Sequence, residues 1–113
     1  MTTSTSTDLE FSTFQKRPAY RYIRQADHLP TCDEARASKN PIAFVKLFNP
    51  TGRWTFYACG YDADTRIAWG LVKDYEREIG DVYMPEIVAI RGRFGLPIER
   101  DLYWHPTVIG EIA

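Results

Sequence analysis

Two carboxylates stand two residues apart near the end of the chain, in the stretch GLPIERDLYW. In an extended segment Glu99 and Asp101 would project from the same face, with their side chains roughly 6–7 Å apart. That separation is close to the spacing of the paired carboxylates in retaining glycosidases. Carboxylates in this arrangement are usually solvated or paired with arginine, however, and the surrounding sequence implies no substrate cleft. We therefore expect Glu99 and Asp101 to face solvent or a partner, and not to catalyse a reaction.

Arg100 lies between these carboxylates and would point to the opposite, apolar face of the extended segment, together with Ile98 and Leu102. A guanidinium on that face requires a carboxylate or carbonyl partner, because burying it unpaired is costly. The carboxylates that could pair with it are Glu76, Glu78 and Glu86. We predict a structural ion pair at Arg100 that fixes the C-terminal segment to the rest of the domain.

Four side chains could bind zinc, namely His28, Cys32, Cys59 and His105. His28 and Cys32 are four residues apart, but Cys59 and His105 are isolated, whereas structural zinc sites present closely spaced pairs of ligands. The chain has no G-x-S-x-G motif and no cysteine-protease signature, and RGRFG lacks the spacing of a phosphate-binding loop. We expect no metal, no cofactor and no enzymatic activity, with Cys59 as a small buried residue.

Aromatic residues in the middle of the chain could form a face on which single-stranded nucleic acid stacks. The residues of such a face are Trp54, Phe56, Tyr57 and Trp69, with Lys46 and Arg53 nearby. Alternatively, alternate residues of these strands form the core, because a small chain with few long aliphatic runs needs aromatic side chains inside. The formal net charge of −1 argues against a general nucleic-acid binder, which normally carries a basic excess.

The order of predicted strands and helices, which must position these residues, indicates an α+β fold. We expect a small antiparallel sheet of three to five strands, arranged as a meander, with one or two short helices packed on one face. IAFVKLF, WTFYACGY and RIAWGLVKDYE are rich in β-forming residues and are separated by the turn sequences NPTGR and DADT. REIGDVYM either closes this sheet or leads away from it. MPEIVAIRG predicts a short helix, with Pro85 in its first turn and Gly92 after its end.

The N-terminal part of the chain is less regular. MTTSTSTD is polar and low in complexity, so that we expect a flexible tail over residues 1–8 and a single α+β domain over residues 9–113. LEFSTFQKR fits a helix or a strand, AYRYI fits a short strand, and one helical turn is expected around Asp33–Ala37 with Asp33 as its cap. Two cysteines and no long apolar stretch predict a cytoplasmic protein that does not bind membranes.

Several motifs resemble a family of small bacterial proteins of unknown function that are common on plasmids, phages and integrative elements. The resemblance rests on the hairpin FVKLFNPTGRWTFYA, which fits a KLF-turn-W-x-x-YA pattern, and on IRGRFGLPIERDLYWHPT, which fits RG-x-x-GLPIERDL; it covers residues 42–107. Members usually carry an acidic residue after the YA, where this chain has Cys59 and Gly60. Because small proteins of mobile elements often block CRISPR or restriction systems, the resemblance implies an anti-defence role.

We therefore expect a non-catalytic accessory protein of a mobile genetic element that binds a host protein complex, such as a nucleic-acid-binding defence effector, and inhibits it by occlusion. Its contacts with this partner are expected to be aromatic and acidic. The candidate residues are Trp54, Tyr57, Tyr61, Asp62, Asp64, Glu99, Asp101 and Tyr103. The alternative is a single-stranded nucleic-acid-binding protein that uses the aromatic face of the sheet.

Overall fold

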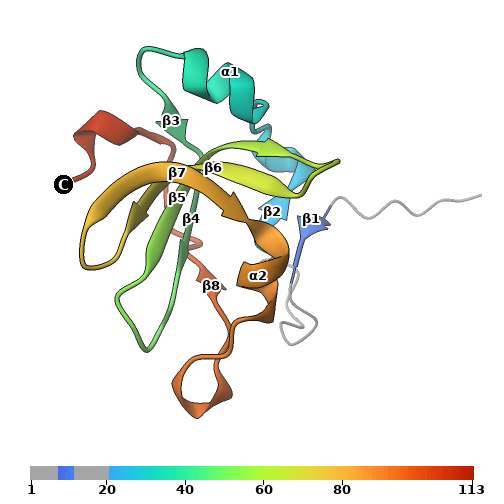
Figure 1. The fold of residues 1–113 in the computed structure, drawn as a ribbon, viewed down its shortest axis with the longest axis vertical. Coiled ribbons are helices and arrows are strands. Elements are labelled where there is room, and N and C mark those ends of the chain that lie inside the picture. The colour runs from blue at the N-terminus through green and yellow to red at the C-terminus, as the bar shows by residue number, and fades with distance from the viewer. Residues whose placement is uncertain (1–7, 12–20) are drawn as a thin grey trace, which may run out of the picture.

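A five-stranded antiparallel sheet is the centre of the fold (Figure 1). Its strands are β4 (Val45–Phe48), β5 (Thr55–Asp62), β6 (Ile67–Lys73), β7 (Arg77–Tyr83) and β8 (Glu99–Arg100). The order across the sheet is β7-β6-β5-β4-β8, so that β4 to β7 form a meander and β8 returns to pair with β4. The computed structural model describes residues 8–11 and 21–113. The predicted α+β class with an antiparallel sheet is confirmed.

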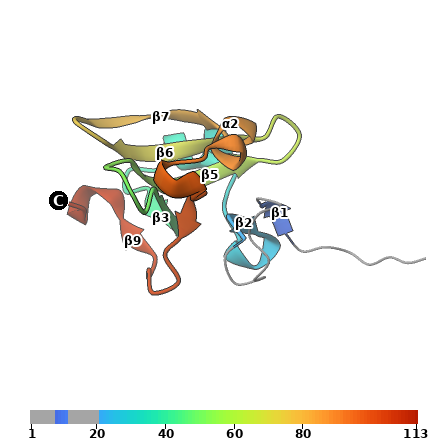
Figure 2. The same cartoon turned by 90° about the horizontal axis from the view of Figure 1, so that it is seen from below.

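Shorter elements surround this sheet. Two further strand pairs are β1 (Asp8–Glu10) with β2 (Ile23–Arg24), and β3 (Ile42–Ala43) with β9 (Thr107–Val108). The helical elements of the described residues are α1 (Cys32–Ala37), α2 (Met84–Ala89) and the 3-10 turns η2 (Gln25–Asp27), η3 (Arg93–Gly95) and η4 (Ile109–Glu111). The β1–β2 pair and the C-terminus lie at opposite sides of the molecule (Figures 1 and 2). No helix in the described part of the chain is long and apolar enough to cross a membrane.

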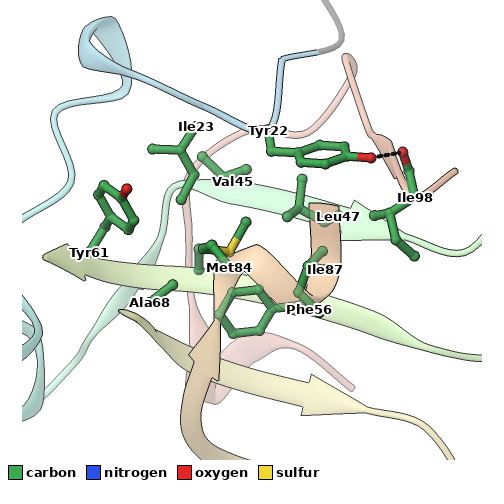
Figure 3. Close-up of a cluster of buried hydrophobic side chains, with 11 residues drawn as sticks. Tyr22, Ile23, Val45, Leu47, Phe56, Tyr61, Ala68, Met84, Ile87 and Ile98 are labelled. Carbon is green, nitrogen blue, oxygen red and sulfur yellow. Dashed lines mark hydrogen bonds between the residues drawn. The ribbon is translucent and has the colours of Figure 1, made fainter. Parts of the chain in front are cut away.

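Both faces of the sheet carry a hydrophobic cluster. Directly paired residues of antiparallel strands project to the same side, so that each cluster gathers side chains from several strands. On one face lies the larger cluster (Figure 3), formed by Tyr22, Ile23, Val45, Leu47, Phe56, Ala58, Tyr61, Ala68, Met84, Ile87 and Ile98. On the other lies a second cluster, formed by Cys32, Ala35, Ala43, Tyr57, Cys59, Trp69, Leu71 and Ile109. Helix α2 contributes Met84 and Ile87 to the first, and α1 contributes Cys32 and Ala35 to the second. The two helices therefore cover opposite faces, whereas the sequence predicted helices on one face only.

Close approach of β5 and β6 explains the glycine in the middle of β6. Gly70 pairs with Ala58, and a Cβ on Gly70 would lie 2.0 Å from the carbonyl oxygen of Tyr57. That distance is far shorter than any real contact, so that only glycine is compatible with the pairing at this position. The register of β5 and β6 shifts between Ala58 and Gly60, where β5 bulges.

Several local predictions are refined by the structure. Strand β7 pairs with β6 along its whole length and closes the sheet on that side. Helix α1 begins at Cys32, and its cap is Thr31, not Asp33. The Thr31 hydroxyl accepts a hydrogen bond from the Glu34 amide (3.2 Å), and the Glu34 carboxylate accepts one from the Thr31 amide (2.9 Å). Helix α2 ends at Ala89, three residues before Gly92.

The N-terminal predictions fall mostly outside the described residues. Of the tail expected over residues 1–8, residues 1–7 are outside the description, and Asp8 is the first residue of β1. Of LEFSTFQKR, Leu9 and Glu10 belong to β1 and residues 12–17 are not described. Of AYRYI, only Ile23 belongs to a strand in the described part.

Candidate functional site: a cleft beside the charged triplet

A cleft of about 450 Å³ opens beside the charged triplet of residues 99–101. One wall is the β4–β5 loop, and the other is the loop that follows β8. The lining residues are Lys46, Phe48, Asn49, Gly52, Thr55, Glu99, Arg100, Asp101, Leu102 and Tyr103. A cleft of this volume is large enough to enclose a side chain or a short peptide segment of a partner.

The floor of the cleft is the end of the sheet face that carries the second cluster. Phe48 pairs with Thr55 on β5 and with Glu99 on β8, so that these three side chains form a row on one face. Lys46 lies two residues before Phe48 on β4 and projects to the same face. All four side chains are half-buried. The antiparallel register therefore brings Glu99 beside residues that lie some fifty positions earlier in the chain.

Lys46 and Asp101 form an ion pair at one side of the cleft, with 3.5 Å between Lys46 Nζ and Asp101 Oδ2. The ammonium also lies 5.7 Å from the ring centre of Tyr57 and 5.6 Å from that of Trp104, within the range of cation–π attraction. The other carboxylate oxygen of Asp101 accepts a hydrogen bond from the Tyr103 amide (2.9 Å). Asp101 therefore serves both to fix Lys46 and to shape the loop after β8.

Arg100 points to the opposite face of the sheet and is 8% exposed. Its guanidinium donates two hydrogen bonds of 2.7 Å to the Asp27 carboxylate and a third, of 3.3 Å, to the Tyr22 carbonyl. Burial alone would raise the pKa of the Asp27 carboxyl. The hydrogen bonds from Arg100 and the Arg24 amide, with the charges of both arginines, more than offset burial and hold that pKa below its ordinary value.

The carboxylate partners predicted for Arg100 are therefore wrong. Glu76 lies just before β7 and Glu78 lies within it, and β7 forms the edge of the sheet opposite to β8. Glu86 is exposed on α2. The partner is Asp27 in η2, and the pair joins β8 to a segment that lies 73 residues earlier in the chain.

Glu99 has no partner of this kind. No hydrogen bond or ion pair joins its half-buried carboxylate to any other residue of the described part of the chain. The two cations that line the cleft are each held by another carboxylate, Lys46 by Asp101 and Arg100 by Asp27. The negative charge of Glu99 is consequently the uncompensated charge of the cleft.

Exposed apolar side chains gather in the segment on both sides of β8. Phe94 is 88% exposed and Tyr103 is 89% exposed, and Leu96 and Leu102 are also exposed. Figure 1 shows the loop between α2 and β8, in orange, projecting away from the sheet. The Arg93 amide donates a hydrogen bond to the Thr51 hydroxyl (3.1 Å), which places this loop against the β4–β5 loop that forms one wall of the cleft.

The backbone of the projecting loop is closed by a hydrogen bond of 2.7 Å from the Gly92 amide to the Leu96 carbonyl. Within it Phe94 has φ 61°, and Gly95 has φ 71°. The left-handed region suits Gly95 but is unfavourable for a bulky residue such as Phe94. The fold therefore holds an exposed phenylalanine in a strained conformation at the tip of a fixed loop.

The eight residues predicted to contact a partner do not form one surface. Glu99, Asp101 and Tyr103 line the cleft. Tyr57 and Tyr61 are each only 7% exposed, so that the prediction of surface contacts is wrong for both. The Tyr61 hydroxyl donates a 2.5 Å hydrogen bond to the buried Glu10 carboxylate, which also pairs with Arg66. The side chain of Tyr61 therefore ties β1 to the sheet.

The remaining three predicted contacts lie elsewhere. Trp54 is half-buried, and its ring centre lies 6.1 Å from that of Phe56. Asp62 accepts a 3.1 Å hydrogen bond from the Cys32 amide at the start of α1. Asp64 is exposed in the β5–β6 turn. Trp54, Asp62 and Asp64 are all absent from the lining of the cleft.

The aromatic face expected for nucleic-acid stacking is not at the surface. Phe56 is fully buried, and Tyr57 and Trp69 are exposed by less than a tenth. The alternative prediction, that these rings form the core, is the arrangement observed. Both faces of β5 are covered, so that its aromatic residues pack inside whichever way they point.

The four potential zinc ligands do not form a site in residues 8–11 and 21–113, where no three His, Cys, Asp or Glu side chains are grouped as metal ligands. Cys32 and Cys59 are buried in the second cluster. Burial, with Asp62 adding to it at Cys32, raises the pKa of each thiol to about 12. At neutral pH both thiols are therefore protonated and poor nucleophiles.

Three contributors to this region were not among the predicted contacts, and they differ in how much signal the sequence carries for them. Asp27 is separated from Arg100 by most of the chain, and no local pattern relates them. Phe94 lies within RGRFG, where two glycines around an aromatic residue do indicate a tight turn with a presented side chain. Lys46 interrupts the apolar run FVKLF, and a charge at such a position indicates that one face of the strand is not fully covered.

A family model described as a protein of unknown function, DUF2958, matches residues 15–109. The chain belongs to the DUF2958 family. The predicted membership in a family of unknown function is thus confirmed in that general form. No curated protein and no solved structure matches the chain. Since the description of DUF2958 states no activity, an interpretation of function depends on the chemistry of the cleft and its surroundings.

Proposed function

We propose that this DUF2958 protein is a non-catalytic protein-binding module, and that it contacts its partner through the cleft and the apolar side chains around it. The observation that carries the proposal is the exposure of Phe94, Leu96, Leu102 and Tyr103 within one ten-residue segment. Large apolar side chains gathered at the surface of a small domain mark protein contact sites. Aromatic side chains at the centre of such sites usually contribute most of the binding energy.

The conformation of Phe94 gives independent support. A bulky residue at φ 61° costs free energy in the isolated protein, and almost the whole of its ring is in solvent. Neither property favours folding. Strained residues of this kind are concentrated at binding and catalytic sites, where the surrounding structure maintains them. An aromatic anchor that inserts into a pocket of the partner explains both the strain and the exposure.

The chemistry of the cleft favours binding over catalysis. Asp101 is paired with Lys46, and Arg100 is paired with Asp27, so that neither provides a free acid, base or anion-stabilising group. A carboxylate pair acting on a glycoside would require Asp101 to be available alongside Glu99. The thiols of Cys32 and Cys59 are buried away from the cleft and protonated at neutral pH. These arrangements suit a surface that recognises another protein.

The narrower form of the proposal concerns the partner. In this form, the protein belongs to a mobile genetic element and acts in the cytoplasm on a host defence complex, of the CRISPR or restriction type, by occluding its nucleic-acid-binding surface. Such surfaces are basic because they neutralise phosphates. The free carboxylate of Glu99 and the exposed ring of Tyr103 are complementary to a surface of that kind. The likeness of the sequence to proteins of plasmids and phages supports the same setting.

Affinity capture with matched variants tests the binding surface. The tagged full chain is used as bait in bacteria that express CRISPR or restriction complexes, together with the double variant Phe94→Ala/Tyr103→Ala and the control Tyr75→Ala. Tyr75 is 83% exposed and does not line the cleft. It lies in the turn between β6 and β7, where its ring packs on the Arg53 guanidinium of the β4–β5 loop (4.8 Å), so that it controls for the loss of an exposed aromatic ring near the cleft. The partner captured by the wild type and by Tyr75→Ala should be lost with the double variant. With purified partner, the dissociation constant of the double variant should rise about 30-fold or more.

Two outcomes would overturn this proposal. One is a partner whose binding is lost with Tyr75→Ala and unaffected by the double variant, because the interface would then lie on the β6–β7 hairpin. The other is salt-dependent retardation of random single-stranded oligonucleotides in a mobility-shift assay, at a strength that matches or exceeds protein binding. That result would establish the nucleic-acid-binding alternative, since phosphate contacts weaken as salt rises.

A further inference from the structure

The charge pattern of the cleft indicates the kind of group that it can bind. Lys46 and Arg100 are both neutralised by carboxylates of this chain, whereas the half-buried Glu99 carboxylate pairs with no other described residue. A carboxylate partly removed from water is destabilised unless hydrogen-bond donors or a positive charge approach it. The cleft therefore offers a carboxylate that is free to pair with a cationic hydrogen-bond donor of a partner.

The surroundings of Glu99 suit a planar cation. Tyr103 lines the same cleft and presents an almost fully exposed ring. Its backbone is fixed, because its amide donates to the Asp101 carboxylate. Thr55 and Asn49 also line the cleft. An aromatic face and a carboxylate in one open cleft offer a guanidinium both a stacking surface and a pair of acceptor oxygens.

We infer that the cleft receives an arginine side chain of the partner protein, whose guanidinium pairs with the Glu99 carboxylate and stacks on the Tyr103 ring. This inference rests on the proposed protein-binding function and specifies the chemistry of the partner: a basic segment with an arginine at the point of contact. Lysine would fit less well, because its ammonium group cannot form two parallel hydrogen bonds with a carboxylate or stack as a plane.

An anionic ligand is the competing occupant, since two cations line the cleft. The geometry is unfavourable to it. The Arg100 guanidinium is directed to the other face and donates three hydrogen bonds there, and the Lys46 ammonium is held between Asp101 and two aromatic rings. A phosphate in the cleft would have to displace one of these pairs and would also meet the charge of Glu99.

The experiment is a titration of the ¹⁵N-labelled full chain, followed by amide chemical shifts near neutral pH. The probes are acetyl-Gly-Arg-Gly-amide, the same tripeptide with lysine or with neutral citrulline in place of arginine, and inorganic phosphate. The arginine peptide should produce saturable shifts at the amides of Thr55, Glu99 and Tyr103, with a dissociation constant on the order of millimolar. The citrulline peptide, which keeps the shape but not the charge, should bind about tenfold more weakly or worse.

Matched variants assign the effect to Glu99. Glu99→Gln should weaken the arginine peptide about tenfold while leaving the melting temperature unchanged, because its carboxylate has no partner to lose. Glu78→Gln removes an exposed carboxylate from β7, at the opposite edge of the sheet, and should leave peptide binding unchanged. A melting curve for each variant verifies that a loss of binding is not a loss of folding.

Any of three results would overturn the inference. The first is the absence of saturable shifts up to about 50 mM arginine peptide. The second is binding of the citrulline peptide to the wild type, or of the arginine peptide to Glu99→Gln, that is as tight as binding of the arginine peptide to the wild type, and the third is tighter binding of phosphate than of the arginine peptide. Its failure is distinguishable from failure of the proposed function. If the partner is lost with Phe94→Ala/Tyr103→Ala but the arginine peptide does not bind, the protein-binding surface stands and the arginine site does not. If the peptide binds through Glu99 but the double variant retains its partner, the proposed surface fails.

Discussion

The ion pair between Arg100 and Asp27 gives the sharpest test of how the triplet supports the fold. Replacing Arg100 by Met keeps much of the side-chain volume but removes the donors to both Asp27 oxygens and to the Tyr22 carbonyl. Asp27 is then left with its side chain 7% exposed and without its main counter-charge. Breaking a buried pair from one side in this way costs about 3–5 kcal/mol. For a domain of this size we expect the melting temperature to fall by about 12–20 °C.

Urea unfolding followed by circular dichroism measures this change, and two further variants interpret it. Glu99→Gln alters the neighbouring residue on the same strand and should change the free energy of unfolding by less than about 0.5 kcal/mol. Asp27→Asn combined with Arg100→Met should recover part of the loss, because no uncompensated charge then remains buried. If Arg100→Met alone costs less than about 1 kcal/mol, Asp27 is well solvated and the pair does not clamp the C-terminal segment.

The same pair has a defined dependence on pH. Because the pKa of Asp27 is lower in the folded protein than its ordinary value of 3.8, the pair stabilises the fold fully above that value. The contribution is lost as pH falls below 3.8 and through the folded pKa, where the carboxyl becomes protonated. The difference in stability between the wild type and Arg100→Met should therefore be constant near neutrality and shrink in acid. A difference that grows on acidification would contradict this reasoning.

Two further substitutions test the backbone. Phe94→Gly should relieve the strain at φ 61° and raise the free energy of unfolding by up to about 1 kcal/mol in urea titrations. The same substitution removes the proposed anchor and should weaken partner capture. A loss of stability would show that the ring packs on the fold. Gly70→Ala should cost several kcal/mol or prevent folding, because the added Cβ meets the Tyr57 carbonyl at 2.0 Å, and a soluble variant of unchanged melting temperature would exclude that close approach.

The meander could be predicted because its signals are local. Alternating β-forming residues, the NPTGR and DADT turns and the Pro85 helix start each act within a few residues, and the structure contains them in the expected order. The return of β8 to β4 is not local. Leu47 and Arg100 pair across more than fifty residues, and the pattern of a two-residue strand does not specify which edge it joins. Asp27 could not be identified as a partner for the same reason.

The burial of Tyr57 and Tyr61 has a different origin. An alternating strand with one solvated face would have placed alternate residues outside. In β5, however, six consecutive residues from Phe56 to Tyr61 are buried, because α1 and α2 cover opposite faces of the sheet. The continuous apolar run of WTFYACGY is typical of a strand covered on both sides. The prediction that Tyr57 and Tyr61 contact a partner required one face of β5 to be exposed, and this pattern does not predict an exposed face.

Glu99, Arg100 and Asp101 are adjacent in the sequence, but the alternation of side chains along β8 gives them different roles. Arg100 pairs with Leu47 and projects to the first cluster, whereas Glu99 pairs with Phe48 and projects to the cleft. Asp101 follows the strand, pairs with Lys46 and accepts a hydrogen bond from the Tyr103 amide. Two of the three charges are therefore neutralised by partners within the chain and contribute to its fold. Glu99 is the one carboxylate of the triplet that pairs with no other described residue, so that an effect of Glu99→Gln on binding, without a change in melting temperature, reports on the partner.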